Sequence, residues 1–224
     1  MIIELESGEK KLYTFRPTAH GGGYDDILFR GDQVLMTASN PTLNSEGVNV
    51  FPALVRATLC GKTVEVEPVL YGDATATNIP TGTTTTLNLT DPDSLTVDPR
   101  GNIVLDSQAD AQLVFIRRPF TAGREVGRLR ITTSSGPTTV DDTTFAPSPR
   151  SFLLVADLKG EAVYRIDSPT FGFEPGVAYS ASDTAGIVGT LNLDTGVLMP
   201  IVTGLGSGRG MRFVSVGDHD EDER

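Results

Sequence analysis

Charged side chains recur at the start of four similar segments of this 224-residue chain. Three segments begin with aspartates and the fourth with an arginine: Asp25-Asp26, Asp93, Asp142 and Arg209. Positions 26, 93, 142 and 209 are separated by 67, 49 and 67 residues. Carboxylates that lie close together repel one another unless a proton or a cation intervenes, and their oxygens are ligands for calcium. A fold that gathered these residues would therefore create an acidic site suited to a cation.

Each of these segments continues as a short strand. After Asp93, Leu95 and Val97 alternate along one face, residues 98–102 form a turn, and Ile103 and Leu105 resume the alternation. Similar strands follow Asp26 and Asp142, and a fourth begins near Gly208. The 24 glycines and 14 prolines favour turns. The pattern therefore predicts an all-β protein.

Repeats of about 40–50 residues that each hold several short strands are typical of β-propeller blades. We predict one propeller-type domain over residues 1–224, with blade-like repeats at approximately 19–90, 91–139, 140–203, and 204–224 together with 1–18. This amounts to about three full blades and a partial one. An N-terminal hairpin could close the ring against the strand at 211–216, or a second chain could share the blades. A third alternative is that the chain is part of a longer protein.

The innermost strand of every propeller blade lines the central channel, so residues just before these strands converge at one channel mouth. We therefore predict a ligand site at this mouth, with candidate metal ligands in Asp26, Asp93 and Asp142. Neighbours that could join are Tyr24, Ser94, Asp141 and Ser207. The alternative is that the aspartates cap turns or accept backbone N–H bonds before the strands. The complete candidate set is His20, Asp25, Asp26, Asp93, Asp142 and Arg209.

Two stretches resemble a known family. Residues 92–104 (PDSLTVDPRGNIV) and 154–167 (LVADLKGEAVYRID) are similar to blades of gluconolactonase/regucalcin-like and NHL-repeat propellers. The resemblance implies a divalent metal at the channel mouth, held by Glu, Asn and Asp, which polarises a lactone carbonyl or positions water. Asp93 and Asp142 stand at matching blade positions, whereas the family's Asn-Gly-Leu phrase and a counterpart of its Glu ligand are missing.

Two classes of function follow from these residues. The first is a propeller that binds a small ligand, a cation or another protein. The second is a calcium-dependent lactone or ester hydrolase, with calcium as its cofactor. His20 begins a His-Gly-Gly-Gly match to an esterase oxyanion element, but the chain has no G-x-S-x-G elbow to supply its serine. A serine triad is therefore not expected.

Composition narrows the partners further. The net charge of −11 argues against nucleic acid, which requires a basic footprint, and against anionic membrane surfaces. No apolar run approaches the roughly 20 residues of a spanning helix, and the single Cys60 excludes an internal disulfide. The N-terminus has no secretory signal, which predicts a cytoplasmic protein unless further residues precede it. The acidic run 218–224 reads as a solvated tail.

Overall fold

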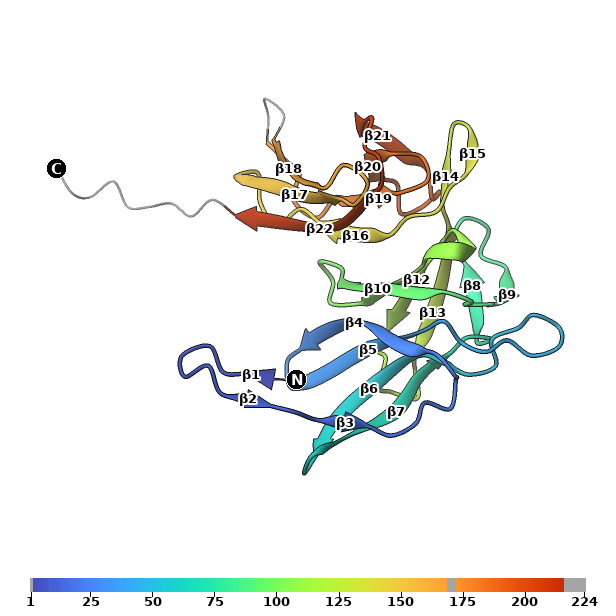
Figure 1. The fold of residues 1–224 in the computed structure, drawn as a ribbon. Coiled ribbons are helices and arrows are strands. Elements are labelled where there is room, and N and C mark those ends of the chain that lie inside the picture. The colour runs from blue at the N-terminus through green and yellow to red at the C-terminus, as the bar shows by residue number, and fades with distance from the viewer. Residues whose placement is uncertain (1, 169–171, 216–224) are drawn as a thin grey trace.

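The computed structural model describes residues 2–168 and 172–215. Strands dominate it, and they form four sheets that follow one another as the blades of a β-propeller (Figure 1). The all-β propeller prediction is confirmed. Within the described residues the only helix is the short 3-10 helix η1 (Gln108–Asp110), and no helix is long and apolar enough to cross a membrane.

The first blade is a twisted antiparallel sheet with a short parallel strand added at its outer edge. Its strands are, from the inside outward, β4 (Gly23–Arg30), β5 (Gln33–Ser39), β6 (Pro52–Cys60), β7 (Thr63–Tyr71) and the added β3 (Thr14–Phe15). Tight turns join the hairpins, such as the one at Gly61, whose φ of 62° lies in the left-handed region that glycine tolerates.

The second blade has the same four-strand order, and a Thr-rich hairpin extends it. Its strands are β10 (Pro92–Val97), β11 (Ile103–Ser107), β12 (Gln112–Arg117) and β13 (Glu125–Arg130), extended by β8 (Thr75–Asn78) and β9 (Thr84–Thr86). The turn between β10 and β11 is fixed by Asp98, whose Oδ1 accepts the backbone N–H groups of Arg100 (2.9 Å) and Asn102 (2.8 Å). This is the turn that the sequence pattern predicts at 98–102.

The third and fourth blades are interleaved along the chain. The third contains β16 (Asp142–Phe145), β19 (Ala178–Ser182), β20 (Ile187–Leu191) and β21 (Leu198–Thr203), and the fourth contains β22 (Gly208–Ser215), β17 (Ser151–Asp157) and β18 (Ala162–Asp167). The sequence repeat suggests that β17 follows β16 in one blade. In the structure β16 instead pairs with β19, and β17 pairs with β22.

Two small hairpins lie outside the blades: β1 (Ile2–Ile3) with β2 (Lys10–Lys11), and β14 (Thr132–Thr133) with β15 (Gly136–Pro137). The prediction that an N-terminal hairpin joins the last strand is not what the structure has. Strands β1 and β2 pair only with each other among the described residues, and β3 pairs with β7. Figure 1 shows the β1–β2 hairpin projecting beside the first blade. The expected acidic tail at 218–224 lies outside the described residues.

Three hydrophobic clusters join the blades in series. The first links blades one and two through residues such as Leu35 and Leu105, and the second links blades two and three through Val104 and Ile187. The third contains Phe173, Tyr179 and Phe213 in edge-to-face contacts between blades three and four. Alternation explains this packing, because period-two strands present one apolar face to each neighbouring blade.

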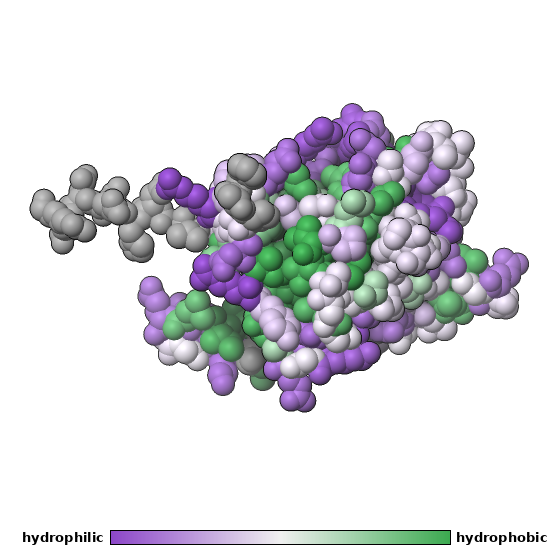
Figure 2. Space-filling model, turned by 90° about the horizontal axis from the view of Figure 1, so that it is seen from above, coloured by the Kyte–Doolittle hydropathy of each residue, from purple (hydrophilic) through white to green (hydrophobic). Residues whose placement is uncertain are grey.

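Apolar side chains remain exposed on the outer strands of the last two blades. Val163 and Tyr164 on β18 and Met199 and Ile201 on β21 are exposed. Figure 2 shows hydrophobic surface over the third and fourth blades, which lie uppermost in Figure 1. These outer strands are the rim of the propeller and lie away from its channel.

Candidate functional site

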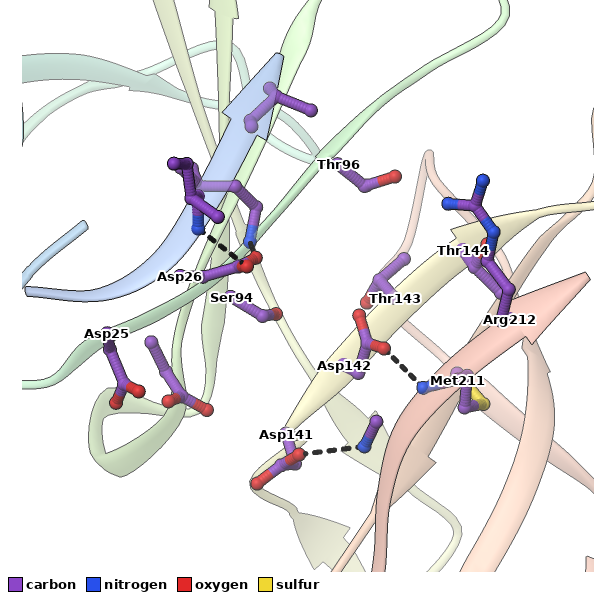
Figure 3. A pocket seen from close by; sticks show the side chains of 15 residues that line it. Asp25, Asp26, Ser94, Thr96, Asp141, Asp142, Thr143, Thr144, Met211 and Arg212 are labelled. Atoms are coloured by element: carbon purple, nitrogen blue, oxygen red, sulfur yellow. Dashed lines mark hydrogen bonds between the residues drawn. The ribbon is translucent and has the colours of Figure 1, made fainter. Parts of the chain in front are cut away.

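The inner strands β4, β10, β16 and β22 bring their first residues to one polar pocket of about 420 Å³ (Figure 3). Strand β10 contacts both β4 and β16, and β16 contacts β22. The pocket is lined by Asp25, Asp26, Asp93, Asp141 and Asp142, with hydroxyl groups from Ser94, Thr96, Thr143 and Thr144. The structure thus brings together Asp25, Asp26, Asp93 and Asp142, as the repeat pattern suggests.

The structure shows which of these residues occupy equivalent positions in the four blades. The pocket takes consecutive residues from each blade, starting at Asp25, Asp93, Asp141 and Gly210. Arg209, one residue before Gly210, is the fourth-blade counterpart of Asp25, Asp93 and Asp141. The next position in each blade holds Asp26, Ser94, Asp142 and Gly210. Asp142 is therefore the counterpart of Asp26, and Asp141 is the counterpart of Asp93. The sequence repeat of positions 26, 93, 142 and 209 makes Asp142 the counterpart of Asp93, which is one residue away from the match in the structure.

Asp26 and Asp142 connect one blade to the next. Asp26 Oδ2 accepts the backbone N–H of Leu95 at 2.7 Å, and Asp142 Oδ2 accepts that of Met211 at 2.5 Å. Leu95 and Met211 occupy the same position in blades two and four, so both bonds have the same geometry in the repeat. A hydrogen bond to a charged group contributes about 1.5–3 kcal/mol. These two aspartates hold the blades together at the mouth.

Thr37 adds a further link between the first two blades. Its Oγ accepts the backbone N–H of Asp26 at 2.9 Å and donates to the carbonyl oxygen of Asp93 at 2.8 Å.

Burial raises the pKa of Asp142 to about 7, although the N–H groups of Met211 and Thr143 oppose the shift. Asp142 therefore titrates near neutral pH instead of remaining fully ionised there.

Asp25, Asp93 and Asp141 form the most acidic part of the mouth. Burial raises the pKa of Asp93 to about 8, with repulsion from Asp141 and Asp25 and a hydrogen bond to the Asp25 side chain as further causes. Burial also raises the pKa of Asp141, against the N–H of Gly210 and the charge of Arg209. Near neutral pH Asp93 therefore holds a proton for much of the time, as a carboxyl group close to other carboxylates does.

Arg209 is a cation of the fourth blade that lies beside the pocket, two residues before Met211, whereas Arg212 of the same strand is part of the pocket lining. Its guanidinium nitrogens lie 3.6 Å from Asp141 Oδ1 and 3.7 Å from Asp183 Oδ2. Gln108 Nε2 also donates to Asp141 Oδ1 at 3.1 Å. Asp141 is therefore neutralised in part by residues of this chain, whereas Asp93 faces mainly other carboxyl groups.

Asp106 lies behind the mouth, on β11. Its side chain is 1% exposed, and neither carboxyl oxygen has a hydrogen-bond partner in the described part of the chain. Burial raises its pKa well above the ordinary range, and the charges of Asp93, Asp142 and Asp141 add to this effect. An unpartnered buried carboxyl group is costly unless it is protonated or bound to another group. It belongs electrostatically to the same cluster.

His20 lies apart from the pocket, contrary to the prediction. Its side chain is buried, Nε2 is 2.9 Å from the carbonyl oxygen of Gly23, and its ring contacts Tyr24 edge-on. The adjoining Gly22 approaches the carbonyl oxygens of Ser39 and Asn40 so closely that a Cβ would overlap them. The glycine run is explained by this close backbone approach.

The candidate metal ligands have other partners. Asp26 and Asp142 accept backbone N–H groups, and Asp93 is hydrogen-bonded to Asp25. Within residues 2–168 and 172–215, no group of three or more His, Cys, Asp or Glu side chains is placed to hold a metal ion. Asp26 and Asp142 thus accept backbone N–H bonds before strands, as the alternative interpretation of the sequence predicts.

The sequence alignment missed two acidic residues of this region, Asp106 and Asp183. The signal for Asp106 is a charge that ends the otherwise apolar run Ile103-Val104-Leu105 on a central strand. Asp183 follows β19 and carries no comparable signal. No protein-family model, curated protein or solved structure matches this chain. We therefore argue its function from the geometry of the mouth.

Proposed function

We propose that this propeller is a binding module whose channel mouth takes a positively charged ligand group, an ammonium or a guanidinium. The observation that carries the proposal is the convergence of Asp25, Asp93 and Asp141 from three blades on one pocket. The equivalent position of the fourth blade holds Arg209, which lies between Asp141 and Asp183. The mouth thus already accommodates a guanidinium, while Asp25 and Asp93 form no ion pair within residues 2–168 and 172–215.

Charge balance supports a cationic ligand. Among the described residues five aspartates line the pocket and the buried Asp106 lies behind it, against two cations, Arg212 in the lining and Arg209 beside it. Asp93 and Asp142 hold protons near neutral pH because burial, with the repulsion of neighbouring carboxylates, raises their pKa values to about 8 and about 7. A bound cation favours the ionised carboxylates, so binding should release protons. The half-buried hydroxyl groups of Ser94 and Thr96 can form hydrogen bonds with the polar part of such a ligand.

Calorimetry tests this proposal directly. Spermidine, arginine methyl ester and calcium chloride serve as probes at pH 7, each titrated in two buffers with different ionisation enthalpies. We expect an organic cation to bind and to release protons, and the Asp25→Asn and Asp93→Asn variants to bind at least tenfold more weakly. Asp194→Asn is the matched control, because Asp194 is exposed in a turn far from the mouth. Binding that is absent, or equal in all variants, contradicts the proposal.

Calcium is the inorganic alternative, and the same titration separates it from organic cations. A site that binds calcium alone, and loses it in Asp93→Asn, would favour the calcium-dependent lactone or ester hydrolase that the gluconolactonase resemblance implies. One observation favours acid–base chemistry: the pKa values of Asp93 and Asp142, about 8 and about 7, lie near the working range of a general acid or base. Hydrolysis of gluconolactone, measured with calcium and with a chelator, tests this second function.

A further inference from the structure

The blade series has two unpaired faces, one on the first blade and one on the fourth. Three hydrophobic clusters join four blades, and among the described residues no cluster joins blade four to blade one. The inner strands of neighbouring blades are in close contact, as β4 is with β10 and β16 is with β22. Over residues 2–168 and 172–215, β4 and β22 do not form such a pair. These two faces are where a neighbouring blade would pack.

Repeat-equivalent residues show what the first blade is built to receive. The position of Ile27 is held by Leu95 and Met211 in blades two and four, and there it packs against the preceding blade. Met211 is 7% exposed, whereas Ile27 is 48% exposed. Ile27 thus keeps an apolar side chain at an interface position that the described part of the chain leaves uncovered.

Phe29, two residues after Ile27, is a second exposed apolar residue of the first blade. Its equivalents are Phe145 and Phe213, which pack in the clusters between blades two and three and between blades three and four. Phe213 is 8% exposed, but Phe29 is 69% exposed. Three aromatic rings therefore occupy one repeat position, and only the ring on the first blade lacks its neighbour.

The fourth blade carries the complementary face. In the third blade Tyr179, paired with Thr144, contacts Phe213 of the next blade at 5.4 Å between ring centroids. In the fourth blade the equivalent of Tyr179 is Leu154, paired with Arg212. Leu154 is half-buried, although its equivalents Leu35, Val104 and Tyr179 are buried. Leu154 is thus the residue that would meet a phenylalanine at the Phe29 position.

Backbone hydrogen bonds agree with this assignment. The N–H groups of Leu95 and Met211 are accepted by an aspartate of the preceding blade. The equivalent N–H of Ile27 is accepted by Asp26 Oδ1 of its own blade at 2.7 Å. The fourth blade has Gly210 at the equivalent of Asp26, so it offers no carboxylate to the next blade there, and the face it offers is the half-buried face of β17 that carries Leu154.

We propose that a second copy of this chain covers both faces, with the first blade of each copy packed on the fourth blade of the other. The contact continues the geometry of the three existing interblade interfaces, where β10 packs on β5 and β22 packs on β19. The two contacts are related by a two-fold axis, and together they close the blades into a ring. Propellers use about four to eight blades, and four blades per chain therefore allow two copies.

Light scattering of the full chain tests the proposal, with an expected mass of twice 23.8 kDa. Phe29→Asp and Leu154→Asp should each give the mass of one chain. Met199→Asp is the control, since Met199 is an exposed apolar residue like Phe29 (61% against 69%) but lies on β21 at the rim, and it should leave the mass doubled. A monomeric parent chain, or a loss of the dimer in the control as well, would overturn the proposal.

Cysteine cross-linking tests the orientation and does not depend on a destabilising variant. In a Cys60→Ser background, Phe29→Cys and Leu154→Cys are prepared separately, mixed and oxidised. Contact between the first blade of one copy and the fourth blade of the other gives a cross-linked dimer in the mixture and none from either variant alone. Cross-linking of Phe29→Cys with itself would mean that two first blades meet, and this result refutes the proposed arrangement.

Discussion

Replacing Asp93 by asparagine should stabilise this protein at alkaline pH. The pKa of Asp93 rises from an ordinary 3.8 to about 8 in the folded chain. Between these two values the folded state binds more protons than the unfolded state, so the free energy of unfolding falls as pH rises. Asparagine keeps the shape and can still hydrogen-bond to Asp25, but it carries no charge at any of these pH values.

The magnitude follows from the same shift. One pKa unit is worth about 1.4 kcal/mol, so the change to about 8 corresponds to at most about 6 kcal/mol. Asp93 is partly open to solvent, which screens its interactions with Asp25 and Asp141. We therefore expect Asp93→Asn to raise the free energy of unfolding by about 1–3 kcal/mol at pH 8.5, and by much less at pH 4.

Urea denaturation at pH 4, 6 and 8.5 is the assay, followed by a signal that reports the whole domain. The parent chain should lose stability from pH 6 to pH 8.5, and Asp93→Asn should lose less of it. Asp194→Asn, at an exposed turn, should follow the parent at every pH. The reasoning is refuted if the parent chain becomes more stable between pH 6 and pH 8.5, or if Asp93→Asn is less stable than the parent at pH 8.5.

Three other substitutions test the packing around the mouth. Asp26→Ala should lower the free energy of unfolding by about 1.5–3 kcal/mol in urea at pH 7, because it leaves the N–H of Leu95 without its acceptor. Asp106→Leu should raise the melting temperature, since it replaces an unpartnered buried carboxyl group by an apolar side chain. Gly189→Ala should cost about 1–3 kcal/mol, because its Cβ would lie 2.4 Å from the carbonyl oxygen of Met199 at the bulge between β20 and β21.

Each of these has its own control. Ser94→Ala, at the position equivalent to Asp26 in the second blade, should change stability by no more than about 0.5 kcal/mol. Asp106→Leu that lowers the melting temperature would indicate that Asp106 has a partner that its apolar replacement removes. Gly23→Ala, at a strand glycine that has open space at its Cβ position and no positive φ, should cost much less than Gly189→Ala.

The sequence predicted the region of the mouth better than the identity of its members. Asp25, Asp26, Asp93 and Asp142 reach one pocket because each stands at the start of an inner strand, which a strand-and-turn pattern reveals. The equivalence of Asp141 with Asp93 depends on register, and the alignment was off by one residue. A shift of one residue turns a side chain to the other face of its strand, so an alignment without pairing information cannot fix it.

His20 and Asp106 illustrate the opposite limit. His20 lies only a few residues before β4, yet it is buried against Gly23 and Tyr24 instead of lining the pocket. Asp106 is distant from the mouth in the repeat pattern, yet the charges of Asp93 and Asp142 act on it. Closeness in sequence to the start of an inner strand therefore does not predict which side chains lie at the mouth, because the direction of each side chain depends on the local backbone and its packing.

The sequence by itself determined that the chain is all-β, where most strands and turns lie, and that aspartates begin three inner strands. Alternation of apolar residues and turn-forming residues are local properties, so they are readable without a structure. Only the tertiary structure decided that β17 and β18 belong with β22 while β16 pairs with β19. Every strand offers the same backbone donors and acceptors to its neighbours. Partner choice is therefore decided by how all the blade faces pack together.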